Sequence, residues 1–205
     1  DVLDIAKNGI RPVSKKKHTF IDLFAGCGGL TEGFYRQNFI PLAHVEFDKS
    51  ACATLRKRME YYGYKNVDKE VIEHDITDPE IISIVDQAVN GREVDIIIGG
   101  PPCQAYSSAG RARDLHGMQN DPRNFLFESY VKILNHDQPK IFVFENVTGI
   151  LTAKVQGKSI IKQVMGALSE NYNVVSDYPQ MLLNSVNYGV PQERKRIIII
   201  GVRRD

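Results

Sequence analysis

The chain has 205 residues, of which 42% are hydrophobic and 25% are charged, a composition typical of one globular domain. A formal net charge of +1 excludes a protein that attracts polyanions through its overall field, so any nucleic-acid site must be local. The three cysteines form no CxxC pair and the histidines do not cluster, which argues against a disulfide framework and a structural zinc site. No apolar run is long enough for a membrane span, and residues 1–18 carry no signal-peptide pattern. We therefore expect no metal and no membrane among its partners.

The first predicted unit is a strand, a glycine loop and a helix, which is how a nucleotide-binding βαβ unit begins. Residues 1–18 are an approach segment whose three lysines favour a solvated basic turn over a DNA contact. A strand at 18–24 enters the glycine loop at 25–30, and a helical pattern follows to about residue 38. Glycines let the backbone approach a ligand, and the start of a helix offers free N–H groups. Such loops can also serve only to pack a helix on a strand, and Cys27 has the place of any small residue.

A carboxylate stands at the end of the second predicted strand, 41–47. Glu46 follows Gly29 by 17 residues, a position that suits hydrogen bonds from the two hydroxyls of an adenosine ribose. The alternative is that Glu46 caps the next helix, but Asp48 is the better cap for a helix at 49–61. The apolar face of that helix includes Cys52, which is therefore predicted to be a core residue.

A third strand is predicted at 71–76 and a helix after it. Asp75 lies at the end of this strand, where it would meet the amino group of an adenine. Asp78 and Pro79 are predicted to open the helix, with the aspartate as cap and the proline in the first turn.

The fourth strand ends in the most restricted turn of the chain. Residues 96–98, which follow Asp95, form an unbroken β-branched run typical of a strand that is buried on both faces, and Gly99-Gly100-Pro101-Pro102 ends it. Cys103 is thus held on a rigid turn at the edge of the sheet, as a nucleophile requires, although a free cysteine is often only a small buried hydrophobe. The long polar loop at 105–121 is interpreted as a lid over a phosphate backbone, with a floppy insertion as the alternative.

The last third of the chain supplies an acid and two arginines. A helix is predicted from the cap Asp121-Pro122, and a strand at 140–144 delivers Glu145 to the same edge as Cys103. The alternative for Glu145 is a buried acid that is bound to a backbone turn. We also predict a helix at about 155–170 and strands at 174–183 and 196–202, the last of which draws Arg194 and Arg196 toward the sheet edge.

These motifs, in this order, resemble the DNA (cytosine-5) methyltransferase family from about residue 19 to residue 203. The resemblance is carried by Asp22-Leu23-Phe24-Ala25-Gly26-Cys27-Gly28-Gly29, Glu46, Asp75, Gly99-Gly100-Pro101-Pro102-Cys103-Gln104, Glu145-Asn146-Val147 and Gln192-x-Arg194-x-Arg196. It implies an α/β fold of the Rossmann-like, S-adenosylmethionine-dependent kind, with a mostly parallel sheet and helices on both faces. It also implies one catalytic, cofactor-binding domain at 19–205.

The resemblance implies a role for each motif residue. A Cys103 adduct at carbon 6 of a flipped-out cytosine would activate carbon 5 for methylation, leaving S-adenosylhomocysteine as the product. The implied catalytic residues are Cys103, Glu145, Arg194 and Arg196. The implied cofactor-binding residues are Phe24, Ala25, Gly26, Cys27, Gly28, Gly29, Leu30, Glu46, Phe47, Asp75, Ile76, Gly100 and Pro101. The expected DNA contacts are Gln104, Ser107, Ser108, Arg111 and Arg113.

Family members continue with a target-recognition region and a last motif, neither of which is found in these 205 residues, so we expect the chain by itself to be inactive. The family implies double-stranded DNA as partner, a monomer, a bacterial cytoplasm close to the nucleoid and a restriction–modification setting. Three rivals are weighed: a tRNA cytosine methyltransferase, a nicotinamide-dependent oxidoreductase and a non-catalytic module. The first lacks its own signature here, the second leaves the cysteine turn and Glu145 without a role, and the third does not explain why all four catalytic residues are present.

Overall fold

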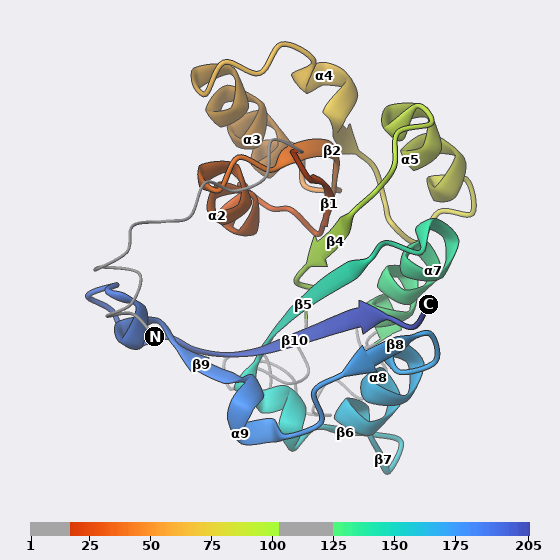
Figure 1. The fold of residues 1–205 in the computed structure, drawn as a ribbon, viewed down its shortest axis with the longest axis vertical. Helices are drawn as coiled ribbons and strands as arrows, with labels where there is room; N and C mark the ends of the chain where they lie inside the picture. The colour runs from red at the N-terminus through yellow and green to blue at the C-terminus, as the bar shows by residue number, and fades with distance from the viewer. Residues whose placement is uncertain (1–16, 103–124) are drawn as a thin grey trace.

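The computed structural model describes residues 17–102 and 125–205, which form one mixed sheet covered by helices (Figure 1). The sheet has the strand order β3-β2-β1-β4-β5-β10-β8, with β9 paired to β10. Strands β3, β2, β1, β4 and β5 are parallel to one another, and β10 is antiparallel to β5, β8 and β9. The predicted Rossmann-like α/β fold is confirmed.

The elements of the first half alternate between strand and helix. Their bounds are β1 Thr19–Leu23, α2 Gly29–Arg36, β2 Ile40–Glu46, α3 Lys49–Tyr61, α4 Val67–Glu70, β3 Val71–Glu73, α5 Ile81–Val89 and β4 Ile96–Gly99.

The second half adds shorter elements around two long strands. Their bounds are α7 Leu126–Asp137, β5 Ile141–Val147, the 3-10 helix η3 Thr148–Leu151, β6 Lys154–Val155, β7 Lys158–Ser159, α8 Ile160–Leu168, β8 Tyr172–Val174, α9 Tyr178–Met181, β9 Leu182–Asn184, the 3-10 helix η4 Ser185–Tyr188 and β10 Lys195–Arg203.

Helices cover both faces of the parallel part of the sheet, as predicted. Helices α2 and α3 lie on one face, and α5, α7 and α8 lie on the other (Figure 1). The largest core cluster lies on the α5–α7–α8 face and includes Tyr130, Phe142 and Phe144, whose rings meet edge to face. Burial of these rings fixes α7 against the strands that lead to the predicted site.

Helix α3 forms where the sequence predicted it. Asp48 is its cap, and its carboxylate accepts a hydrogen bond of 2.8 Å from the amide of Ala51. Cys52 and its apolar neighbours on that face are buried, so the prediction of a core cysteine is confirmed. Burial raises the pKa of the Cys52 thiol to about 11, which keeps it protonated at neutral pH.

Four other predicted elements need correction. The helix expected from Asp78 and Pro79 begins only at Ile81, because the Asp78 carbonyl and carboxylate first accept hydrogen bonds in a separate turn. The strand expected at 71–76 ends at Glu73.

The predicted helix at 155–170 begins only at Ile160. Residues 154–159 form a small hairpin instead, because Gln156 and Gly157 both adopt positive φ and make a tight turn. The strand predicted at 174–183 is divided into β8, α9 and β9, with Pro179 in the first turn of α9. The predicted cap at residues 121–122 lies outside the described residues.

Among residues 17–102 and 125–205, no helix combines the length and the apolar character that crossing a bilayer requires.

Candidate active site

A pocket of about 470 Å³ opens at the carboxyl ends of the parallel strands, the usual ligand position in such sheets. Six residues that the resemblance assigned to the cofactor line it: Phe24, Glu46, Phe47, Asp75, Ile76 and Gly100. Five lining residues were not predicted: Val45, His74, Thr77, Pro102 and Leu126. The first four flank predicted residues in sequence. Leu126 comes from α7, and nothing local in the sequence signals its place.

Glu46 is held rigidly at the pocket. Its two carboxylate oxygens accept hydrogen bonds of 2.8–2.9 Å from the backbone amides of Gly26, Phe47 and Asp48. A carboxylate has about four acceptor positions, so these three bonds leave room for a ligand hydroxyl. The amide of Gly26 thus serves to orient Glu46.

Asp75 is oriented in a similar way. Its Oδ1 accepts hydrogen bonds from the amide and the hydroxyl of Thr77, at 2.9 and 2.8 Å. No residue in the described parts of the chain donates to the other oxygen, which leaves an acceptor at the pocket wall for a donor on a ligand.

The glycine loop supports the pocket from behind. None of residues 25–30 lines the pocket, so a direct cofactor contact by Ala25, Gly26, Cys27, Gly28, Gly29 or Leu30 stays a prediction. A Cβ on Gly28, which has φ +84°, would stand 2.6 Å from Leu55, so this glycine is required for packing α2 against α3. Phe24 also has positive φ, at 60°, a strained value for a bulky residue at the pocket wall.

Asp22 lies directly beneath the loop and is fully buried. The Thr31 hydroxyl donates a hydrogen bond of 2.6 Å to its Oδ2, while its Oδ1 has no partner among the described residues. Burial is the main cause that raises the pKa of Asp22 to about 7, against the lowering effect of the Thr31 hydrogen bond. A buried carboxyl with a raised pKa therefore lies behind the pocket, although it does not line it.

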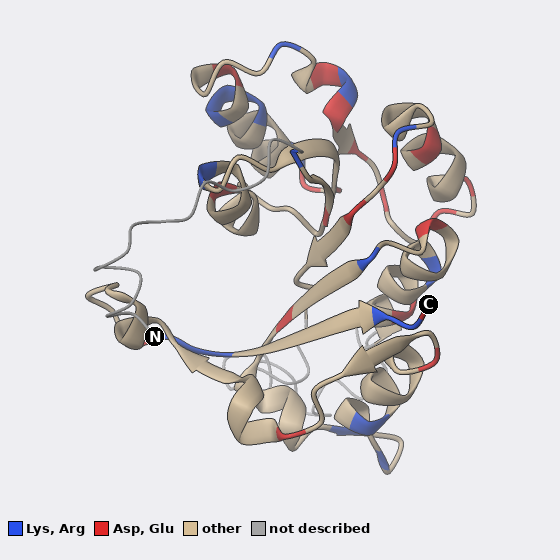
Figure 2. Ribbon diagram, in the orientation of Figure 1, with Lys and Arg blue, Asp and Glu red and all other residues tan. Residues whose placement is uncertain are grey.

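The second part of the site is an ion pair at the ends of β5 and β10. Arg196 Nε lies 2.9 Å from Glu145 Oε1, and both side chains are 24% exposed. Figure 2 shows the acidic end of β5 beside the basic beginning of β10. The exposed fraction leaves the carboxylate accessible to a substrate, while the guanidinium fixes its direction.

Gly100 joins this ion pair to the pocket. A Cβ on Gly100 would stand 2.9 Å from Glu145 Oε2, so only glycine allows the carboxylate to lie against the turn after β4. The side chain of Asn146 donates a hydrogen bond of 3.3 Å to the carbonyl of Pro101, which ties the two strand ends together. The structure thus brings Glu145, Arg196 and the Gly100–Pro101 turn together beside the pocket.

The predicted roles of seven other site residues stay predictions. Cys103, Gln104, Ser107, Ser108, Arg111 and Arg113 lie outside the described residues. Arg194 is exposed, and its amide donates to Asn184 at 3.1 Å. Its predicted catalytic role stays a prediction.

Comparisons with known proteins identify the family of this chain. Residues 18–205 match the family described as C-5 cytosine-specific DNA methylase. The Type II methyltransferase M.DdeI of Desulfomicrobium norvegicum is 40% identical, over 90% of this chain and 40% of its own length. M.Bpa9945I of Bacillus paralicheniformis is 34% identical over 90% and 53%, and M.AquIA of Picosynechococcus is 36% identical over 89% and 71%.

A solved structure has the same fold. It is described as a DNA modification methyltransferase encoded within an E. coli prophage, with a TM-score of 0.69 and 28% identity over 91% of this chain and 47% of its own. The chain spans about half the length of several of these relatives. The family match over residues 18–205 covers far more than half of the chain. This chain belongs to the C-5 cytosine-specific DNA methylase family.

Proposed function

We propose that the protein transfers a methyl group from S-adenosylmethionine to carbon 5 of cytosine in double-stranded DNA, in a restriction–modification setting. Residues 19–205 would act as one catalytic and cofactor-binding domain. The observation that carries the proposal is the Glu145–Arg196 pair, which lies against Gly100 at the wall of the pocket. Relatives described as Type II methyltransferases support it.

The pocket residues fit an adenosine-containing cofactor. Its volume of about 470 Å³ lies in the range of small-molecule sites. Glu46 would accept hydrogen bonds from the ribose hydroxyls, and Asp75 would accept one from the adenine amino group. The exposed ring of Phe47 and the ring of Phe24 would supply apolar contact for the base. When bound, the cofactor supplies an electrophilic methyl group.

Cys103 would act as the nucleophile. Pro102, the residue before it in the sequence, lines the pocket. The Cys103 thiolate forms a sulfur–carbon bond at carbon 6 while the Glu145 carboxyl gives a proton to N3, and carbon 5 becomes nucleophilic. Carbon 5 takes the methyl group, loses its proton to a base, and the sulfur–carbon bond breaks as N3 returns its proton to Glu145. The net products are 5-methylcytosine, the demethylated cofactor and one proton.

Arg196 would be a positioning residue for this acid. Its guanidinium holds Glu145 Oε1 at 2.9 Å, which leaves Oε2, the oxygen nearest Gly100, to face the base. A cytosine inside a duplex is out of reach of such a site, so the base would be flipped out of the helix. Gln104, Ser107, Ser108, Arg111 and Arg113 would contact the DNA backbone around it.

The experiment is transfer of tritiated methyl groups from S-adenosylmethionine to duplex DNA by a protein in which this chain is joined to a target-recognition region, with calorimetric titration of S-adenosylmethionine in parallel. We expect Cys103→Ala to abolish transfer and to leave cofactor affinity within about twofold of wild type. Transfer that survives in Cys103→Ala would contradict the proposed nucleophile. Label that appears in tRNA instead of DNA would contradict the proposed substrate.

A further inference from the structure

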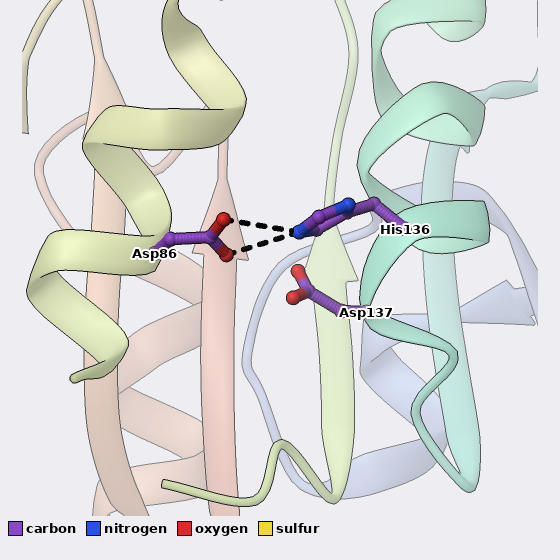
Figure 3. Close-up of side chains that lie close together, drawn as sticks. All are labelled: Asp86, His136 and Asp137. Atoms are coloured by element: carbon purple, nitrogen blue, oxygen red, sulfur yellow. Dashed lines mark hydrogen bonds and ion pairs between the residues drawn. The ribbon is translucent and has the colours of Figure 1, made fainter. Parts of the chain in front are cut away.

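A second group of ligating side chains lies far from the pocket, between the C-terminal parts of helices α5 and α7. Asp86 projects from α5, and His136 and Asp137 project from the last turn of α7 (Figure 3). The three side chains point toward one another across the gap between the helices (Figure 3). The proposed methyl-transfer chemistry uses none of them.

The distances suit one shared cation. His136 Nε2 lies 3.0 and 3.2 Å from the two carboxylate oxygens of Asp86. One ligand atom from each of Asp86, His136 and Asp137 lies within 4.8 Å of the others. Two atoms that bind one Zn²⁺ at about 2.1 Å stand about 3.4 Å apart at a tetrahedral angle, so a small closure of the cluster meets this requirement.

One carboxylate oxygen of Asp137 is available to bind a cation. Its Oδ2 is buried and has no hydrogen-bond partner among the described residues. It also ends α7, where the helix dipole disfavours a negative charge.

The cluster is open to solvent on one side. Asp86 and Asp137 both line a polar hollow of about 470 Å³, which gives an ion and its remaining water ligands a route of entry. The cationic side chains of that hollow are engaged elsewhere. Arg92 donates to the carbonyls of Ala88 and Val89, Lys140 pairs with Glu93 and Asp95, and Arg203 pairs with Asp205.

We propose that Asp86, His136 and Asp137 form a binding site for a divalent transition-metal ion of the Zn²⁺ class, which clamps α5 to α7. One imidazole nitrogen and two carboxylates favour such an ion over Mg²⁺ or Ca²⁺, which prefer oxygen ligands alone. Water would complete the coordination. The ion would stabilise the helices that cover one face of the sheet, and its binding is independent of the methyl-transfer reaction.

The test is calorimetric titration of the 205-residue chain with Zn²⁺, together with thermal unfolding at rising Zn²⁺ concentration. We expect the wild type to bind one Zn²⁺ per chain and to melt at a higher temperature as the Zn²⁺ concentration rises. Both effects should be lost in His136→Gln and in Asp137→Asn. If Asp137→Asn does not fold, Asp86→Asn replaces it at an exposed position. Cobalt(II) absorption spectra without thiolate charge-transfer bands would separate this site from the cysteines.

His74→Gln is the matched control. His74 Nε2 lies 3.0 Å from Asp78, an equally short histidine–aspartate pair, but no third ligating side chain of the described residues joins it. We expect His74→Gln to bind one Zn²⁺ per chain, as the wild type does. Absence of saturable Zn²⁺ binding to the wild type, or equal binding by wild type and His136→Gln, would overturn the proposal and leave an ordinary ion pair.

Discussion

The two edges of the parallel sheet each hold a buried aspartate, and its pKa is lowered at one edge and raised at the other. At the edge where the strands begin, Asp95 accepts hydrogen bonds from Lys140 at 2.6 Å and from the amide of Thr19 at 3.0 Å. Burial alone would raise the pKa of Asp95, but these hydrogen bonds lower it to about 2. At the edge where the strands end, Asp22 has one hydroxyl partner and a pKa raised to about 7.

The difference separates what stabilises the fold from what forms the site. The first edge satisfies its charges within the chain, so it contributes to the free energy of unfolding. The second edge keeps a poorly solvated carboxyl, a strained Phe24 and acceptor positions on Glu46 and Asp75 that a ligand can fill. Perturbed groups and backbone strain concentrate where a protein acts on other molecules.

The largest effect expected at the second edge is on catalysis. Glu145→Gln should reduce the rate of methyl transfer by about 10²–10⁴-fold, because an amide cannot give a proton to N3. The urea midpoint should change little, since the side chain is partly exposed. Glu60→Gln, on the surface of α3, is the control. Equal loss of rate in both variants would show that Glu145 has no special role.

The largest effect expected at the first edge is on stability. Asp95→Ala should lower the free energy of unfolding by about 3 kcal/mol, since Lys140 and the Thr19 amide lose a charged acceptor. Urea denaturation at pH 7 measures it. Asp68→Ala removes a carboxylate that is 93% exposed and should be neutral within error. An unchanged free energy of unfolding in Asp95→Ala would contradict the proposed difference between the two edges.

The pH dependence of the two aspartates should have opposite signs. Asp95 has a lowered pKa, so its contribution is present above pH 3.8 and is lost as pH falls toward 2. Asp22 has a raised pKa, so ionisation destabilises the fold as pH rises from 3.8 to about 7.

This gives a specific expectation for Asp22→Asn. At pH 8 the variant should be more stable than wild type by about 1–2 kcal/mol, because burial of a charge is removed while the Thr31 hydroxyl keeps an acceptor. The gain should shrink as pH falls to 5. Urea titrations at pH 5, 6.5 and 8 test this, and a pH-independent difference between the proteins would contradict it.

The smallest effect is expected for cofactor binding. Glu46→Gln should weaken S-adenosylmethionine binding by about tenfold, or about 1.4 kcal/mol, because an amide is a weaker acceptor for ribose hydroxyls. Calorimetry measures the affinity. Glu73→Gln, at the end of β3 but outside the pocket, should bind as wild type does. An unchanged affinity of Glu46→Gln would contradict the assignment.

The elements that follow local rules could be predicted from the sequence. Helix α3 has its cap at Asp48 and its apolar face at helical spacing, and both are as predicted. The apolar run before Gly99 forms a strand as predicted, and this strand ends at the edge of the sheet where the pocket opens. Six residues that border strand ends and were predicted to bind the cofactor line the pocket.

The predictions that failed concern two interrupted elements and the positions where distant parts of the chain meet. The turn at Gln156 and Gly157 lies inside the range predicted as a helix, and Pro179 lies inside the range predicted as one strand. Leu126 and Asp137 each meet partners from other segments, so no local pattern signals the pocket wall or the cluster with Asp86. Burial in a tertiary environment also gives Asp22 its raised pKa.

The central claim is that Cys103 and Glu145 act on the same pyrimidine ring. Duplex DNA that contains 5-fluorocytosine cannot lose a proton from carbon 5, so the sulfur–carbon adduct should accumulate and can be mapped by mass spectrometry. We expect one adduct, on the peptide that contains Cys103, in the presence of S-adenosylmethionine and none in Cys103→Ala. An adduct that persists in Cys103→Ala, or that maps to the exposed Cys27, would contradict the account.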